Sequence, residues 1–188
     1  MTYTDFAAIP PLRYGLIMAD PPWSFTNYSA KGHRKGAHAH YACLGLDEIC
    51  ALPVGQLAAP DCLLWLWATN PMLPQALRVL EAWSFRFKTA GHWVKRTVGG
   101  KLAFGTGYVL RSAGEPFLIG TIGKPRTSRR VRSVVDGLAR QHSRKPEEGY
   151  AAAEALVPDV HRLELFGRQE RPGWDVFGDE PARFGGAA

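Results

Sequence analysis

The sequence predicts an α/β fold, a three-layer sandwich with helices on both faces of a sheet, on two grounds. Apolar runs of strand length alternate along the chain with segments whose apolar residues recur at helical spacing. The 188 residues, 46% of them hydrophobic, also suit one domain, residues 1–188, with a sizeable core. Strands are expected over residues 16–19, 62–68, 85–95, 115–122 and 161–166, and helices over 47–57, 71–83 and 146–157.

The expected helices have identifiable starts and buried faces. Asp47 is a candidate N-cap of the first helix, and Pro71 suits the first turn of the second. Pro146, followed by two glutamates, opens the third helix. Helical spacing predicts that the core-facing residues of the second helix are Leu73, Ala76, Leu77, Leu80 and Trp83.

The charge balance favours a polyanionic partner. Lys and Arg number 23 against 17 Asp and Glu, and residues 124–145 hold eight basic residues against one acid, Asp136. No apolar run approaches the ~18 residues of a membrane span, and no signal-peptide pattern is visible at the N-terminus. The three cysteines are odd in number and lack C-x-x-C spacing, which is typical of reduced thiols. We therefore expect a cytoplasmic protein that binds nucleic acid and no membrane.

The chemistry of the chain centres on the stretch Leu16-Ile17-Met18-Ala19-Asp20-Pro21-Pro22-Trp23. An apolar strand must end there, because prolines cannot donate to a sheet ladder. Ligands of open α/β sheets bind at the carboxyl ends of strands, so Asp20 is expected over a site. The alternative is an ordinary strand-to-turn segment with a buried Trp23.

Such a corner suits methyl transfer to a planar amino group like the exocyclic nitrogen of adenine. The Asp20 carboxylate and a backbone carbonyl of Asp20 or Pro21 would accept its two N–H bonds and free the lone pair for attack. Trp23 is expected to offer a face on which the base stacks.

A long basic loop follows the corner. Residues 24–45 hold lysines, an arginine and three histidines without an acid. His33, His38 and His40 raise the alternative of a metal site, but Cys43 is the only further candidate ligand nearby. We expect no metal and a loop that faces solvent or phosphate.

Further motifs follow the corner in a fixed order over about residues 12–180. They are His40-Tyr41, Leu63–Thr69, Trp93-Val94-Lys95, Gly105–Tyr108 with Arg111 and Glu115, His142–Pro146, Leu163–Arg168, and Gly173–Asp175 with Gly178-Asp179-Glu180. Together with Asp20–Trp23, this set resembles the adenine-N6 methyltransferases that share a domain with the catalytic subunit of the eukaryotic mRNA adenosine methyltransferase. Compact DPPW-type members of that family occur in bacteria, phages and prophages.

The resemblance implies a Rossmann-like methyltransferase fold of permuted element order, with S-adenosylmethionine as the methyl donor and no metal. It implies catalytic roles for Asp20, Pro21, Pro22 and Trp23, and substrate-binding roles for Tyr41, Glu115 and Lys145. The implied donor-binding residues are Asp20, Lys145, Phe166, Gly167, Arg168, Asp179 and Glu180. The chain departs from the family's usual Gly-Asn-Glu or Gly-Asn-Gln at residues 178–180, and its segment 169–173 is shorter.

Several alternatives stand beside these assignments. Lys145 can be an exposed lysine at a helix start, Glu115 can pair with Arg111, and Arg168 can pair with Glu164 or Glu170. DNA is the expected substrate, because a stand-alone domain without an RNA-binding appendage fits a phage or prophage modification enzyme. RNA, a protein glutamine and a catalytically silent nucleic-acid-binding subunit are the alternatives. The resemblance also implies pairing as a homodimer or with a sister subunit.

Overall fold

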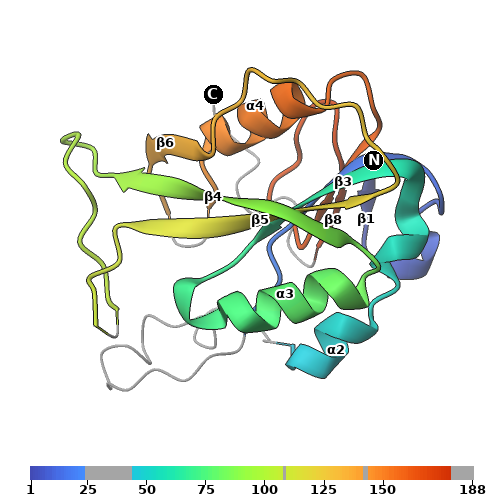
Figure 1. The fold of residues 1–188 in the computed structure, drawn as a ribbon, viewed down its shortest axis with the longest axis horizontal. Helices are drawn as coiled ribbons and strands as arrows, with labels where there is room; N and C mark the ends of the chain where they lie inside the picture. The colour runs from blue at the N-terminus through green and yellow to red at the C-terminus, as the bar shows by residue number, and fades with distance from the viewer. Residues whose placement is uncertain (24–43, 108, 142–143, 179–188) are drawn as a thin grey trace.

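The computed structural model describes residues 1–23, 44–107, 109–141 and 144–178, and these form the predicted α/β architecture (Figure 1). One mixed sheet of eight strands has the order β1-β8-β7-β2-β3-β5-β4-β6. The strands are β1 (Thr2–Tyr3), β2 (Tyr14–Ala19), β3 (Ala58–Trp67), β4 (Arg86–Arg96), β5 (Gly114–Ile122), β6 (Val134–Leu138), β7 (Arg162–Leu165) and β8 (Asp175–Phe177). The helices are α2 (Leu46–Ala51), α3 (Leu73–Ala82) and α4 (Glu147–Leu156), with 3₁₀ turns η1 (Phe6–Ala8), η3 (Val54–Leu57) and η4 (Asn70–Met72).

Strand β2 lies at the centre of the sheet, and all six of its residues are buried. It runs parallel to β3 on one side and to β7 on the other, which explains its continuous apolar sequence. Strand β5 is antiparallel to β3 and β4. The carboxyl ends of β2, β3, β4 and β7 therefore meet the start of β5 at one edge of the sheet.

The two faces of the sheet carry two apolar layers, and Figure 1 shows α3 and α4 on opposite sides of the strands. On the α3 side, Ile17 and Leu64 pack with Leu80. On the α4 side, Trp65 and Phe117 stack with ring centroids 3.9 Å apart. The alternation of side chains along each strand divides the core in this way, and the fold is a Rossmann-like three-layer sandwich.

The structure corrects the expected start and end of the first helix. Helix α2 begins at Leu46 with Gly45 as its N-cap, and the Gly45 N–H donates to Glu48 Oε2 at 2.7 Å. Asp47 is not the cap; it pairs with Arg78 at 2.7 Å. Pro53 interrupts the predicted helix over 47–57, because it follows the last turn of α2 and precedes η3.

Helix α3 confirms the predicted second helix, and the structure corrects one position of its face. Its buried residues are Ala76, Val79 and Leu80, whereas Leu77 is exposed. Strands β1, β6 and β8 were not expected from the sequence, because β1 and β8 hold only two and three residues and β6 lies within the basic segment 124–145. None of the helices in the described part of the chain has the length and apolar character required to cross a bilayer.

Gly91 allows β4 to pack closely against its neighbours. A Cβ at this position would lie 2.1 Å from Phe117 Cζ and 2.7 Å from the Ser133 carbonyl oxygen. We expect Gly91→Ala to lower the free energy of unfolding by about 2–3 kcal/mol, because the Phe117–Trp65 stack must shift. The matched control is Gly99→Ala, because no atom lies within 4 Å of its Cβ position. Urea unfolding followed by tryptophan fluorescence measures both, and equal stability of the two variants would contradict the packing argument.

Candidate active site

The Asp20 corner lies directly after β2, at the edge of the sheet where the strand ends meet. The Asp20 N–H donates to the Leu165 carbonyl of β7 at 3.4 Å, and the Pro21 carbonyl accepts the Trp23 N–H at 2.7 Å. The Asp20 side chain is 25% exposed, so it lies at the rim of the core rather than inside it. The strand end predicted from the prolines is confirmed.

Trp23 differs from its predicted environment. Its residue is 4% exposed, it belongs to the α3-side core, and its Nε1 donates to the Trp67 carbonyl at 3.2 Å. The expectation that Trp23 offers an open face for a base is therefore wrong in this structure. The indole instead ties the corner to the end of β3.

Four charged side chains from separate segments form a chain of ion pairs beside the corner. Lys145 Nζ lies 2.7 Å from Asp20 Oδ2 and 2.7 Å from Glu115 Oε1. Lys95 Nζ lies 2.8 Å from Glu115 Oε2. The two ammonium groups and two carboxylates balance in charge.

The surroundings of these four ion-paired side chains determine their protonation states. Burial alone would raise the pKa of Glu115, but the ammonium groups of Lys145 and Lys95 outweigh burial and hold it below its usual range. Burial would lower the pKa of Lys145, yet Asp20 and Glu115 raise it, so the ammonium keeps its proton. Burial raises the pKa of Asp20, and Lys145 opposes this shift. Of the two carboxylates, Asp20 therefore accepts a proton more readily than Glu115.

The structure rules out the alternative environments that the sequence left open for Lys145 and Glu115. Lys145 is 8% exposed, so it is not a solvated lysine at a helix start. Glu115 pairs with two lysines, while the Arg111 guanidinium lies 5.5 Å from the centre of the Phe104 ring. Lys95 was missed as a site residue, because its place depends on the register that pairs Trp93 with Glu115.

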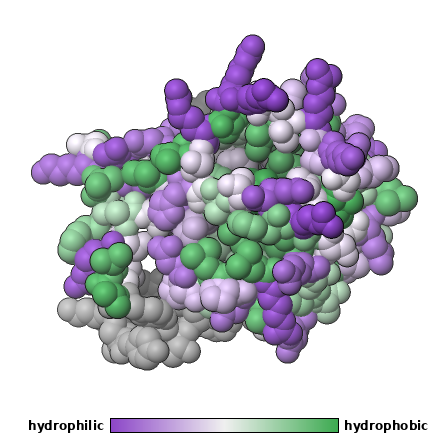
Figure 2. Space-filling model, viewed as in Figure 1, coloured by the Kyte–Doolittle hydropathy of each residue, from purple (hydrophilic) through white to green (hydrophobic). Residues whose placement is uncertain are grey.

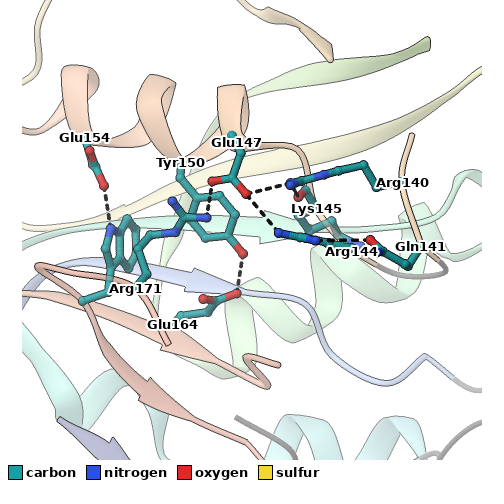
Figure 3. Close-up of polar contacts among 10 residues, drawn as sticks. Arg140, Gln141, Arg144, Lys145, Glu147, Tyr150, Glu154, Glu164 and Arg171 are labelled. Carbon is teal, nitrogen blue, oxygen red and sulfur yellow. Dashed lines mark hydrogen bonds and ion pairs between the residues drawn. The ribbon is translucent and has the colours of Figure 1, made fainter. Parts of the chain in front are cut away.

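A cluster around Glu147, at the start of α4, fixes the backbone on which Lys145 lies (Figure 3). Arg140 donates to Glu147 Oε1 at 2.7 Å and to the Lys145 carbonyl at 3.0 Å. Arg144 lies 3.8 Å from the same carboxylate, and Arg171 also pairs with it. These arginines were expected only as parts of a basic tract or a loop, and they hold Lys145 in place.

The end of β7 presents a buried carboxylate to the same region. Tyr150 Oη donates to Glu164 Oε1 at 2.6 Å, while Glu164 Oε2 is buried without a hydrogen-bond partner in the described residues. Burial raises the pKa of Glu164 from 4.5 to about 7. An acceptor of this kind suits a cationic group, and S-adenosylmethionine carries an ammonium and a sulfonium. The residues present therefore fit such a donor.

The predicted donor-binding residues fall partly within the described chain. Phe166 has a φ of 63°, and the Gly167 N–H donates to the Phe177 carbonyl at 2.9 Å, so the ends of β7 and β8 lie together beside the corner. Arg168 follows directly and is half-buried. Tyr41, Asp179 and Glu180 lie outside the described residues, as do the histidines at 33, 38 and 40. Within the described chain, no group of three His, Cys, Asp or Glu residues gathers as metal ligands would.

A cavity of about 420 Å³ lies away from the four ion-paired side chains. Its floor includes Trp65 and Phe117, and Lys88, Lys124 and Arg132 line its rim. Lys88 is near the start of β4, whereas Lys95 is near its end, so this cavity lies toward the opposite edge of the sheet. It is not the space beside Asp20.

The fold is that of a Rossmann-like methyltransferase, and comparison with known proteins identifies the family. A model of the MT-A70 family matches residues 14–180. The chain therefore belongs to the MT-A70 family of N6-adenine methyltransferases.

Three relatives show the range of this family. The Type II methyltransferase M.MunI from Mycoplasma sp is 30% identical over 93% of this chain and 81% of its own length. Human N(6)-adenine-specific methyltransferase METTL4 is 28% identical over 96% of this chain and 41% of its own length. The N6-methyladenosine RNA methyltransferase MTA1 from Cryphonectria parasitica is 32% identical over 95% of this chain and 54% of its own length. The chain thus spans about half or less of the latter two.

We expect Glu164 to make the stability of the protein depend on pH. The folded carboxyl keeps its proton to about pH 7, whereas the unfolded one loses it near 4.5. The folded state therefore binds the extra proton between these values, and stability is lost as pH rises through them. From pH 5 to pH 8 the wild type should lose about 3 kcal/mol more of its free energy of unfolding than Glu164→Gln.

Urea unfolding at the two pH values measures this difference. Glu81→Gln, on the exposed surface at the end of α3, is the control and should follow the wild type. A Glu164→Gln variant with the same pH dependence as the wild type would contradict the raised pKa.

Proposed function

We propose that this protein transfers a methyl group from S-adenosylmethionine to the exocyclic N6 of adenine in DNA. The observation that carries the proposal is the Asp20 carboxylate at the end of β2, which Lys145 holds through Oδ2 and which is 25% exposed at the rim of the core. Membership in the MT-A70 family supports the reaction class.

The corner activates the amine by accepting its hydrogens. Asp20 Oδ1 accepts one N–H bond, and the Pro21 carbonyl, which retains a second lone pair beside the Trp23 N–H, accepts the other. This draws the nitrogen out of conjugation with the ring and aims its lone pair away from the corner. Pro22 and Trp23 hold the corner rigid, the latter through its bond to the Trp67 carbonyl.

The residues on the donor side and the ion-paired side chains beside Asp20 complete the proposed site. S-adenosylmethionine, when bound, supplies an electrophilic methyl carbon on a sulfonium. We assign its binding to Asp20, Lys145, Phe166, Gly167, Arg168, Asp179 and Glu180, and we assign Tyr41, Glu115 and Lys145 to the substrate side. Lys145 orients Asp20, Asp20 and Glu115 keep Lys145 charged, and Lys95 pairs with Glu115. The proton lost from the methylated amine goes to water at the exposed side of the corner.

DNA is the proposed substrate over RNA. Of the three relatives described above, the Type II methyltransferase M.MunI is the one that the chain covers over most of its length. RNA is the second candidate, because MTA1 is named as an RNA methyltransferase and is 32% identical. The net charge of +6 suits either polyanion. Pairing with a second copy or a sister subunit, and a cytoplasmic location, stay predictions.

We expect Asp20→Ala to lower the rate of methyl transfer by roughly 10²–10³-fold or more, because the amine loses its charged acceptor. The variant should keep its fold, because Lys145 stays paired with Glu115. Transfer of tritiated methyl to unmethylated genomic DNA measures the effect. Asp47→Ala, which removes an exposed carboxylate of α2, is the matched control and should retain activity.

Unchanged transfer by Asp20→Ala would refute the assignment of the corner. No transfer by the wild type to any nucleic acid, together with no heat of donor binding in calorimetry, would favour the silent subunit.

The substrate class is tested with DNA and RNA of the same sequence at equal concentration. We expect N6-methyladenine in the DNA digest at a level well above that in the RNA digest, measured by mass spectrometry. A higher level in RNA would overturn the DNA assignment and leave the reaction unchanged.

A further inference from the structure

The loop between β4 and β5, residues 97–113, exposes large apolar side chains to solvent. Val98, Leu102, Phe104, Val109 and Leu110 are between 54% and 95% exposed. Figure 1 shows the loop projecting from the body at the left, and Figure 2 shows apolar surface on that side. Apolar groups gathered on one exposed segment do not stabilise the fold and mark a surface for an interaction partner.

The described part of this loop has a defined shape. The Ala103 N–H donates to the Lys95 carbonyl at 2.8 Å, and the Gly105 N–H donates to the Ser112 carbonyl at 2.8 Å. Gly107 makes a close turn, because a Cβ there would lie 1.9 Å from the Leu110 carbonyl oxygen. The apolar side chains are therefore presented by a hydrogen-bonded base.

Both ends of the loop lie next to the candidate active site. The strands that it joins carry Lys95 and Glu115, which belong to the chain of ion pairs beside Asp20. The Lys95 N–H donates to the Ala113 carbonyl at 2.9 Å, so the two ends of the loop are joined next to the site. The base of the loop therefore lies beside the ion pairs of the Asp20 corner.

The charge of the loop favours a polyanionic partner. Residues 97–113 contain Lys101 and Arg111 and no acid. The Arg111 guanidinium lies 5.5 Å from the centre of the Phe104 ring, which places a cation beside an exposed aromatic side chain of the loop. Apolar side chains next to cations suit nucleic acid, where bases stack beside phosphates.

We propose that Phe104, Val109 and Leu110 form a wedge that enters duplex DNA beside the target adenine; this inference rests on the proposed function and deepens it. An adenine inside a duplex has its amino group paired and its ring stacked, while Asp20 lies at the rim of the sheet. The base must leave the stack, at a cost of a few kcal/mol. Apolar side chains inserted at the vacated step offset that cost.

The test compares duplex and denatured DNA as substrates of Phe104→Ser, Leu110→Ser and the double variant. The control is Leu12→Ser, which changes an exposed leucine before β2, at the opposite edge of the sheet. We expect transfer to unmethylated duplex DNA to fall by about tenfold or more in the double variant. Transfer to the same DNA after heat denaturation should stay within about twofold of the wild type, because no stack must be opened.

Three outcomes would overturn the wedge. Equal losses on both DNA forms would mean that the loop supports the site itself, and unchanged duplex transfer would mean that the loop is not used. Conversion of a dimer to a monomer by the variants, seen in analytical ultracentrifugation, would mean that the loop binds a second copy. A wild type that methylates neither DNA form is a separate result, which refutes the proposed function and the wedge with it.

Discussion

The candidate site depends on one ammonium group, that of Lys145, shared by two carboxylates in a largely buried setting. It joins the end of β2, the start of β5 and the segment before α4, which are far apart in the sequence. Removing a buried charge from water is costly, and the pairing of Lys145 with two carboxylates offsets that cost. The arrangement orients Asp20 through one oxygen of its carboxylate, Oδ2.

The support for Lys145 comes from its backbone as well as from its charge. The Glu147 carboxylate gathers arginines from the preceding segment and from the loop after β7, and one of them also binds the Lys145 carbonyl. The Arg171 guanidinium lies 3.8 Å from the centre of the Tyr150 ring, whose hydroxyl reaches Glu164. The residues proposed for the substrate side and for the donor side are thus parts of one polar network beneath α4.

The elements that could be predicted were those with strong local signals. The corner at Asp20 followed from two prolines after an apolar strand, and α4 followed from Pro146 and its glutamates. Strands β1 and β8 could not be predicted, because strands of two and three residues are defined by pairing rather than by sequence pattern. Strand β6 lies within the segment 124–145, whose most prominent feature is its basic charge. Lys95 depends on a register between two strands, and the burial of Trp23 depends on a carbonyl at the end of β3. Both features depend on tertiary contacts, so the local sequence pattern cannot predict them.

The central strand has a consequence for how the chain acquires its shape during translation. One neighbour of β2 is β3, but the other is β7, which is complete only after residue 165 has been added. Until then a growing chain on the ribosome holds β2 with an open hydrogen-bonding edge, which invites pairing with other nascent chains. The corner that bears Asp20 is made early, yet its amide acquires the Leu165 carbonyl only near the end of synthesis.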